Sequence, residues 1–229
     1  MKINLTKHMK IIVKTIVSYA FLISFSVHAG FYEDFFKAVK YDDVQRIENL
    51  LQLGFDPNTP DPLGQLPIVI ALREPSLKVA AVLINSAQIK LNLLNSAGES
   101  ALMIASLTGD LKLVRIMVAK DADINKTGWT ALHYAASKGH LDVISFLLEN
   151  HAYIDAASPN GTTPLMMASR YGSIESVKLL LDQGADASLK NMQGLTALQF
   201  AQTGVRPDAI SLLSALKKQT DFVKPAGSW

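Results

Sequence analysis

The chain has 229 residues, of which 49% are hydrophobic and 18% are charged. This composition is that of a folded domain and is too apolar for an intrinsically disordered chain. The absence of cysteine excludes disulfide bonds, a zinc–cysteine site and a cysteine nucleophile, so packing must supply the stability.

The first 29 residues have the layout of a secretory signal peptide. Lysines precede an apolar stretch from Thr15 to Val27, and small residues around Ala29 suit cleavage before Gly30. The alternative is a membrane anchor, but the apolar run has 13 residues, whereas a spanning helix needs about 20. We therefore expect export to the periplasm, or secretion as the alternative, with no stable membrane insertion after cleavage.

Removal of residues 1–29 changes the charge of the chain. The whole sequence has 22 basic and 20 acidic residues and a pI near 8.7. The removed segment holds four lysines and no acidic residue, which leaves 18 basic against 20 acidic residues, a net charge of −2. The high pI belongs to the precursor, and we predict no nucleic-acid partner.

A similar phrase recurs along the rest of the chain and opens at a glycine. Gly64, Gly98, Gly128, Gly161 and Gly194 are separated by 34, 30, 33 and 33 residues. A fixed period of this length is typical of stacked repeat units. The period predicts a repeat domain of residues 30–221 and a C-terminal tail of 222–229. The expected units are 31–63, 64–97, 98–127, 128–160, 161–193 and 194–221.

Each unit has the signals of a short helix. A hydroxyl residue two positions after the glycine can cap it, and these residues are Ser100, Thr130, Thr163 and Thr196. Pro67 and Pro164 stand at the first helical position, where the missing N–H costs nothing. About eight residues later, Gly109, Gly139 and Gly172 suit a helix end that requires a positive φ.

A second helix follows in each unit. Leu141, Ile144 and Leu147 have the spacing of one face of a 3.6-residue helix. These second helices end at Gly54, Asp121, His151 and Gly184. Asp and His take the glycine position in two units because they tolerate a positive φ better than most residues.

The units resemble ankyrin repeats. The clearest stretch runs from Gly128-Trp-Thr-Ala-Leu-His to Gly184-Ala-Asp186, and the resemblance covers about residues 31–220. It is specific because several positions recur at one period. It implies an all-α solenoid of about six helix-turn-helix units with short connecting turns or hairpins. It also implies that His133 is a buried side chain hydrogen-bonded to turn backbone.

Three departures from the pattern predict local irregularities. The step from Gly98 to Gly128 is three residues short, and Asn125-Lys126-Thr127 replaces a longer hairpin, so we expect a stunted turn there. The second unit, with Arg73-Glu74-Pro75 at its turn, is the least regular. Val205-Arg-Pro207 interrupts the usual turn of the last unit.

The sequence shows no constellation for catalysis, a metal or another cofactor. His140 and His151 do not join His133 in metal-ligand spacing on one helix face. The acidic pairs at 33–34 and 42–43 fall at helix starts, where carboxylates favour the positive end of the dipole. No nucleophile-elbow or phosphate-loop phrase occurs. We therefore predict that the protein is not an enzyme and needs no cofactor.

The resemblance implies partner contacts just after the turn glycine and at the end of the first helix. These residues are Trp129, Thr162, Leu195, Leu107, Thr108, Ser137, Lys138, Arg170 and Tyr171. Trp, Tyr and Arg are enriched in binding hot spots. The alternative is that Trp129 and Tyr171 only pack against neighbouring repeats. We predict a monomeric module that binds another protein through its concave face, with a structural or self-associating cell-envelope protein as the alternative.

Overall fold

The computed structural model describes residues 30–74 and 77–223, with side chains described up to residue 218. This part of the chain forms helices joined by loops and contains no strand, so the predicted all-α class is confirmed. None of its helices has both the length and the apolar character needed to span a bilayer. The expected signal peptide at 1–29 lies outside the described residues, as do residues 224–229 of the expected tail 222–229, whose first two residues continue the last helix.

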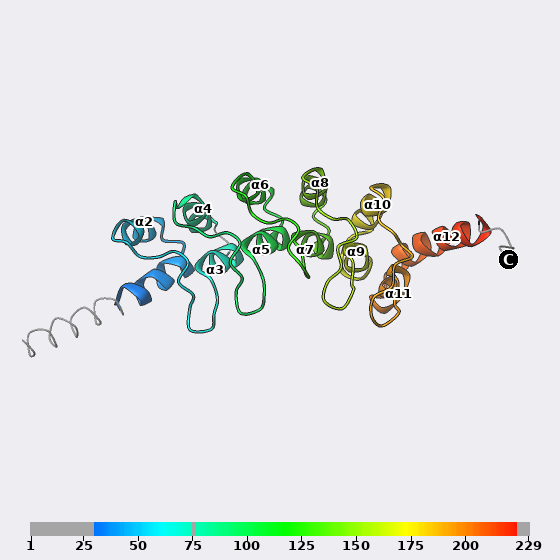
Figure 1. Cartoon of the computed structure of the whole chain (residues 1–229), viewed down its shortest axis with the longest axis horizontal. Helices are drawn as coiled ribbons and strands as arrows, with labels where there is room; N and C mark the ends of the chain where they lie inside the picture. Colours follow the sequence, from blue (N-terminus) through cyan, green and yellow to red (C-terminus); the bar gives the residue numbers. More distant parts are fainter. Residues whose placement is uncertain (1–29, 75–76, 224–229) are drawn as a thin grey trace, which may run out of the picture.

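Six helix pairs follow one another along the described chain. They are residues 30–40 with α2 (Val44–Gln52), α3 (Pro67–Arg73) with α4 (Lys78–Asn85), α5 (Ala101–Thr108) with α6 (Leu111–Ala119), α7 (Ala131–Lys138) with α8 (Leu141–Glu149), α9 (Pro164–Tyr171) with α10 (Ile174–Asp182), and α11 (Ala197–Thr203) with α12 (Pro207–Val223). The first helices form an inner row and the second helices an outer row, and both rows arch in the same sense (Figure 1). The predicted solenoid of about six units is confirmed.

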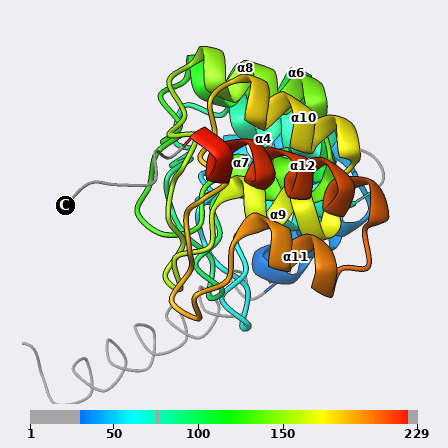
Figure 2. The same ribbon diagram turned by 90° about the vertical axis from the view of Figure 1, so that its right-hand side faces the viewer.

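One hydrophobic core runs between the two rows. Seen from the C-terminal end, α6, α8 and α10 line up on one side of it, and the loops leave on another side (Figure 2). An alanine seven residues after each turn glycine is at most 1% exposed, and these residues are Ala71, Ala105, Ala135, Ala168 and Ala201. Because a methyl group occupies little space, successive inner helices can pack closely.

The inner helices begin as the sequence predicts. Ser100 and Thr163 each accept a hydrogen bond from the backbone N–H three residues on, at 3.3 and 3.4 Å. Thr130 and Thr196 hold the same N-cap position in α7 and α11. Proline stands at the first position of α3 and of α9. The outer helices are also followed by the predicted left-handed residues Gly54, Asp121, His151 and Gly184.

The turn between the two helices of a unit differs from the prediction in one place. Gly109 and Gly139 have φ of 79° and 72°, as expected, but Gly172 has φ of −80°. A Cβ atom on Gly172 would lie 2.4 Å from the carbonyl oxygen of Ala136 on α7. Glycine is therefore needed there for the close approach of two repeats, and the prediction of a positive φ was wrong.

The last turn holds a strained residue. Val205 has φ of 52° and is 80% exposed. The left-handed region costs an L-residue roughly 1–2 kcal/mol, and a β-branched side chain is the least suited to it. The irregularity predicted at Val205-Arg-Pro207 is therefore confirmed, and the positive φ falls on valine because Gly204, one residue earlier, is right-handed.

Replacing Val205 by glycine is expected to raise the free energy of unfolding by about 1 kcal/mol, because glycine adopts this φ without strain. Urea denaturation followed by circular dichroism measures the change. Val205→Asn should recover part of the gain, since asparagine tolerates the left-handed region. A Val205→Gly protein no more stable than the wild type would contradict the strained turn.

Amide side chains connect the bases of successive loops. Each of three asparagines bonds twice to the next loop, at 2.8–3.2 Å, and these residues are Asn58, Asn92 and Asn125. The side-chain oxygen accepts from a backbone N–H of that loop, and the side-chain NH2 donates to the carbonyl of the residue two positions before that N–H. Asp155 takes the next place and accepts from the N–H of Asp186 at 3.1 Å. Burial raises the pKa of the Asp155 carboxyl; the N–H of Asp186 lowers it and the charge of Asp186 raises it. The fourth connection therefore lacks a donor and contains an unfavourable charge.

Asp155→Asn is expected to raise the free energy of unfolding at pH 7 by about 1 kcal/mol, since the amide can donate to the carbonyl of Gly184. An acid whose folded-state pKa is raised destabilises the fold above that pKa, and the penalty disappears below the unfolded value of 3.8. The gain in stability should therefore shrink on acidification, which urea unfolding at pH 7 and below pH 3.8 measures. Asp182→Asn, on an exposed outer position, removes the same charge and should gain nothing comparable.

The loop between α6 and α7 is short, as predicted. It spans residues 120–130, three residues fewer than the loops at 150–163 and 183–196. In Figure 1 it extends little beyond the inner row, whereas the other long loops project well below it. The stunted turn expected at 125–127 is confirmed.

Candidate functional site

The concave face has the inner helices at its centre and a row of loop tips along one edge. Four tips, at 61–64, 95–98, 158–161 and 191–194, are tight turns closed by the glycine N–H, which donates to the carbonyl three residues earlier at 2.8–2.9 Å. Two pairs of neighbouring tips are also joined, since the N–H of Ser96 donates to the carbonyl of Gly64 in the preceding tip at 3.0 Å and that of Met192 donates to the carbonyl of Asn160 at 2.9 Å. These bonds fix the two tips of each pair relative to one another before any partner binds.

The residues predicted for partner contact lie at opposite ends of the inner helices. Trp129, Thr162 and Leu195 stand just before the N-termini of α7, α9 and α11, whereas the other six lie at the C-termini of α5, α7 and α9. An eight-residue helix is about 12 Å long. A partner that contacts both groups must therefore cross the width of the face.

Thr162 does not present its side chain to a partner, contrary to the prediction. It is 1% exposed, its N–H donates to Ser158 Oγ at 2.9 Å, and its carbonyl accepts from His133 Nε2 at 2.9 Å. These bonds to its own turn and to the preceding repeat hold it inside. The equivalent Leu195 remains partly exposed, so we leave only Thr162 out of the candidate face.

Trp129 packs within its own repeat. Its ring lies edge-to-face against His133 with centroids 5.1 Å apart, and its carbonyl accepts from Lys126 Nζ at 3.4 Å. Part of the indole remains exposed. Trp129 therefore fits the packing interpretation in part and still contributes surface to the loop edge.

Arg170 and Tyr171 lie at the C-terminus of α9, where the arginine is partly buried and the tyrosine is exposed. Tyr171 is 54% exposed, and the guanidinium of Arg170 lies over its ring at 5.0 Å from the centroid. Gly204 packs closely against the backbone of Arg170, which fixes the position from which the arginine side chain extends. A cation that is stacked on a ring in this way presents its charge with little conformational freedom to lose when a partner binds.

The remaining predicted residues differ in what they offer. The hydroxyl groups of Ser137 and Thr108 donate to carbonyls three residues earlier in their own helices, at 2.8 and 3.1 Å. Leu107 is partly buried and its carbonyl accepts from His140. Lys138 is exposed. Lys138 is therefore the only charged group of α7 that the face presents at this end.

A polar cluster that we had not predicted joins three successive units. Arg73 pairs with Glu99 at 2.6 Å, and Glu99 also accepts from Asn95 at 2.8 Å and from the Tyr134 hydroxyl at 3.2 Å. Burial and the Glu99 carboxylate raise the pKa of Tyr134 to about 12. Glu99 is thus satisfied by three donors and contributes no free negative charge to the face.

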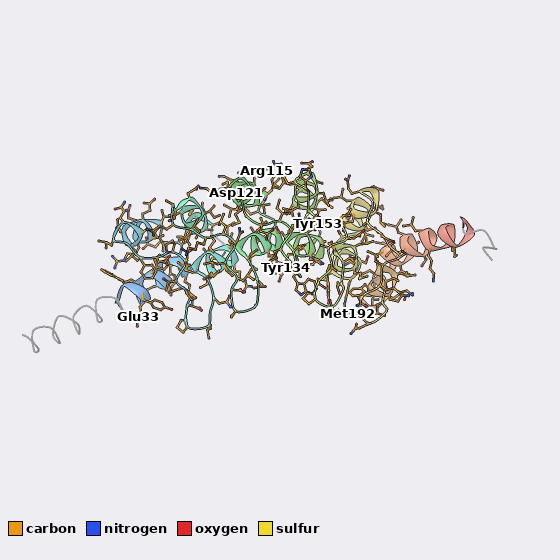
Figure 3. The ribbon with its side chains drawn as sticks, in the orientation of Figure 1. Glu33, Arg115, Asp121, Tyr134, Tyr153 and Met192 are labelled. Atoms are coloured by element: carbon orange, nitrogen blue, oxygen red, sulfur yellow. The ribbon has the colours of Figure 1, made fainter. Side chains whose placement is uncertain are left out.

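Exposed apolar side chains stand at two tips. Leu63 is 77% exposed and Met192 is 80% exposed. Figure 3 shows Met192 at the loop edge and Arg115 on the opposite, outer side. The sequence did not predict these two residues as part of the face, because almost any side chain is tolerated at such a turn position.

The histidines and acidic residues do not form a metal site in the described part of the chain. His133 is fully buried and bonded to Thr130 and Thr162, as the resemblance implied. His140 bonds to Leu107 at 3.0 Å. An open depression of 760 Å³ lies between α2 and α4, away from the candidate face.

The chain is similar to known proteins along most of its length. The family model for ankyrin repeats (3 copies) matches residues 35–127, 87–158, 109–191 and 151–224. The ankyrin repeat protein YahD of Escherichia coli (strain K12) is 31% identical over 179 residues, which is 74% of this chain and 88% of YahD. BCL-6 corepressor-like protein 1 of Homo sapiens is 36% identical over 112 residues, or 47% of this chain.

Several of these relatives are much longer proteins. The match spans 6% of the human corepressor-like protein and 14% of the mouse Ankyrin repeat and SAM domain-containing protein 6. Among solved structures, one chain of the Bd0816 predatory endopeptidase from Bdellovibrio bacteriovorus in complex with immunity protein Bd3460 is similar, with a TM-score of 0.67 and 28% identity. The similarity covers 80% of this chain and 97% of that chain.

Proposed function

The chain belongs to the ankyrin repeat family, whose repeats are protein–protein interaction modules, and from this premise we propose that it is a non-catalytic module that binds a partner protein through its concave face. The observation that carries the proposal is the stacked Arg170–Tyr171 pair, in which the tyrosine is exposed, on a face whose loop tips are joined in two pairs by hydrogen bonds. A rigid face with stacked aromatic and arginine anchors loses little entropy on binding.

We also propose that the protein works after export, in the periplasm or as a secreted protein. The support for this is the sequence of residues 1–29, with lysines, a short apolar run and small residues before Gly30. N-terminal sequencing of the protein recovered from the cell envelope tests it. A chain that begins at Gly30 supports export, and a chain that retains residues 1–29 in the cytoplasm contradicts it.

The similar chain from a peptidase–immunity complex favours a narrower candidate, in which the partner is an endopeptidase and this chain acts as its immunity protein. The full-length gene product with a C-terminal tag, captured from its own envelope extract, separates the candidates. A retained peptidase supports the narrower function. Another retained protein supports only the general one, and light scattering that shows concentration-dependent assembly without a partner supports self-association instead.

The Arg170→Ala/Tyr171→Ala double variant is expected to retain the captured partner at least about tenfold less, because hot-spot truncations each cost more than 1 kcal/mol. Quantitative mass spectrometry of the eluate measures retention. Arg115→Ala is the matched control, since Arg115 also lies over an aromatic ring, that of Phe146, but on the outer row. Equal retention by the wild type and both variants would show that the Arg170–Tyr171 pair is not an anchor for the partner.

A further inference from the structure

Positive charge gathers on the concave face from α7 onward. The helices α7, α9 and α11 and the loop tips before them, at 125–129, 158–162 and 191–195, contain three cations and no carboxylate. The cations are Lys126, Lys138 and Arg170. The outer helices α8 and α10 behind them contain four carboxylates and one lysine. This part of the solenoid therefore has a basic concave side and an acidic outer side.

These three cations are not neutralised within the described part of the protein. Ion pairs there join Arg46 to Asp34 and Arg73 to Glu99, and none involves the three. Lys126 donates only to backbone carbonyls, Arg170 lies over a tyrosine ring, and Lys138 is exposed. Their charge is thus available to a ligand.

The row of loop tips is interrupted beside them. A Cβ atom on Gly64, Gly128 or Gly161 would lie 2.9–3.6 Å from the next tip, whereas a Cβ on Gly98 would meet nothing within 4 Å. The reason is the shortened loop 120–130, which does not reach alongside the tip 95–98 (Figure 1). We call this opening, beside Gly98 in the tip 95–98, the notch.

We propose that the basic part of the concave face binds an acidic, extended segment of the partner protein, with one end of the segment leaving through the notch. The proposal rests on the proposed function and adds the chemistry of the partner. Its carboxylates would contact Lys138 and Arg170, whose guanidinium can bind a carboxylate through two hydrogen bonds. Trp129 and Tyr171 would contact apolar residues between them.

The geometry favours a peptide segment over a larger polyanion. Inner helices pack about 10 Å apart, so α7 to α11 span about 20 Å, the length of about six extended residues. Lys126 and Arg170 are partly buried, which keeps them from a flat membrane surface. The carboxylates of α8 and α10 would repel a long nucleic acid that extended past the face.

The test uses the full-length protein and a fluorescein-labelled decapeptide that carries four glutamates among serine, leucine and tyrosine. Fluorescence anisotropy at about 50 mM salt should show at least about tenfold tighter binding of this peptide than of the same peptide with glutamines. Lys138→Glu/Arg170→Glu should weaken binding about tenfold. Lys112→Glu/Lys178→Glu, the same charge change on the outer row, should leave the dissociation constant within about twofold.

Circular dichroism of both double variants is the check that their helices are retained. Equal binding of the two peptides, equal effects of the two double variants, or binding only of phosphatidylglycerol vesicles or single-stranded DNA would overturn the proposal. If the acidic peptide fails while Arg170→Ala/Tyr171→Ala still loses the captured partner, the concave face remains the binding site and only the acidic chemistry of the partner is wrong.

Discussion

Replacing Gly172 by alanine is expected to lower the free energy of unfolding by about 3 kcal/mol, the upper end of the cost of overpacking a well-packed site. The new Cβ atom would lie 2.4 Å from the carbonyl oxygen of Ala136 and 2.9 Å from that of Ala168. Both are backbone atoms of inner helices, so they cannot move aside without shifting α7 or α9. The repeat interface must open to accommodate one methyl group.

Urea denaturation of Gly172→Ala against the wild type measures this loss. The matched control is Gly184→Ala, because Gly184 has φ of 96° but open space where its Cβ would stand. The control should cost only the strain of the left-handed region, about 1 kcal/mol. If the two variants lose the same stability, the contact between α7 and the turn at Gly172 is not the reason for that glycine.

The helices could be predicted from the sequence because their signals are local. Ser100 and Thr163 bond to atoms three residues away, and Pro164 acts on the first turn of its own helix. The recurrence of these signals at one period then predicted the stacking, since a single helix pair cannot bury its apolar face alone.

Contacts between repeats could not be predicted in the same way. Gly172 occupies the same place in its unit as Gly139 but serves a contact with the preceding repeat instead of a positive φ. Thr162 takes a position that is partly exposed at Leu195, yet hydrogen bonds to Ser158 and to His133 of the preceding repeat keep it buried. A single sequence does not show which neighbour each of these residues meets.

The polar cluster on the concave face left one signal in the sequence. Tyr134 stands where the neighbouring units have Ile104 and Met167, so a hydroxyl group appears at an otherwise apolar position. Its partner Glu99 is 35 residues away along the chain. The substitution indicates that a polar partner exists, but only the stacking of α5 on α7 identifies it.

His133 is expected to make the protein sensitive to acid, because its bonds require the neutral ring. Nε2 lies 2.9 Å from the carbonyl oxygen of Thr162, which can only accept, so Nε2 carries the hydrogen. Nδ1 then accepts from the backbone N–H of Thr130 at 3.2 Å. Protonation of Nδ1 would break this bond at the N-terminus of α7.

Burial lowers the pKa of His133 from 6.5 to about 4, although its bond to the Thr162 carbonyl favours the charged form. Between these two pH values the His133 imidazole is therefore protonated in the unfolded chain and neutral in the folded chain. The contribution of the neutral histidine is complete above pH 6.5 and is lost as the pH falls towards 4, for a total on the order of 3 kcal/mol.

His133→Met tests this argument, because α5 and α9 carry Met103 and Met166 at the same position. At pH 7 the variant should be less stable by about 1–2 kcal/mol, since the buried carbonyl of Thr162 loses its donor. At pH 4 the variant should be more stable than the wild type, because methionine does not bind a proton in the unfolded chain. His151→Asn, which removes an exposed histidine at a left-handed position that asparagine also tolerates, should follow the wild type at both pH values. Parallel urea midpoints for wild type and His133→Met from pH 7 to pH 4 would show that another group causes the loss in acid, whereas a crossing of the two curves assigns it to His133.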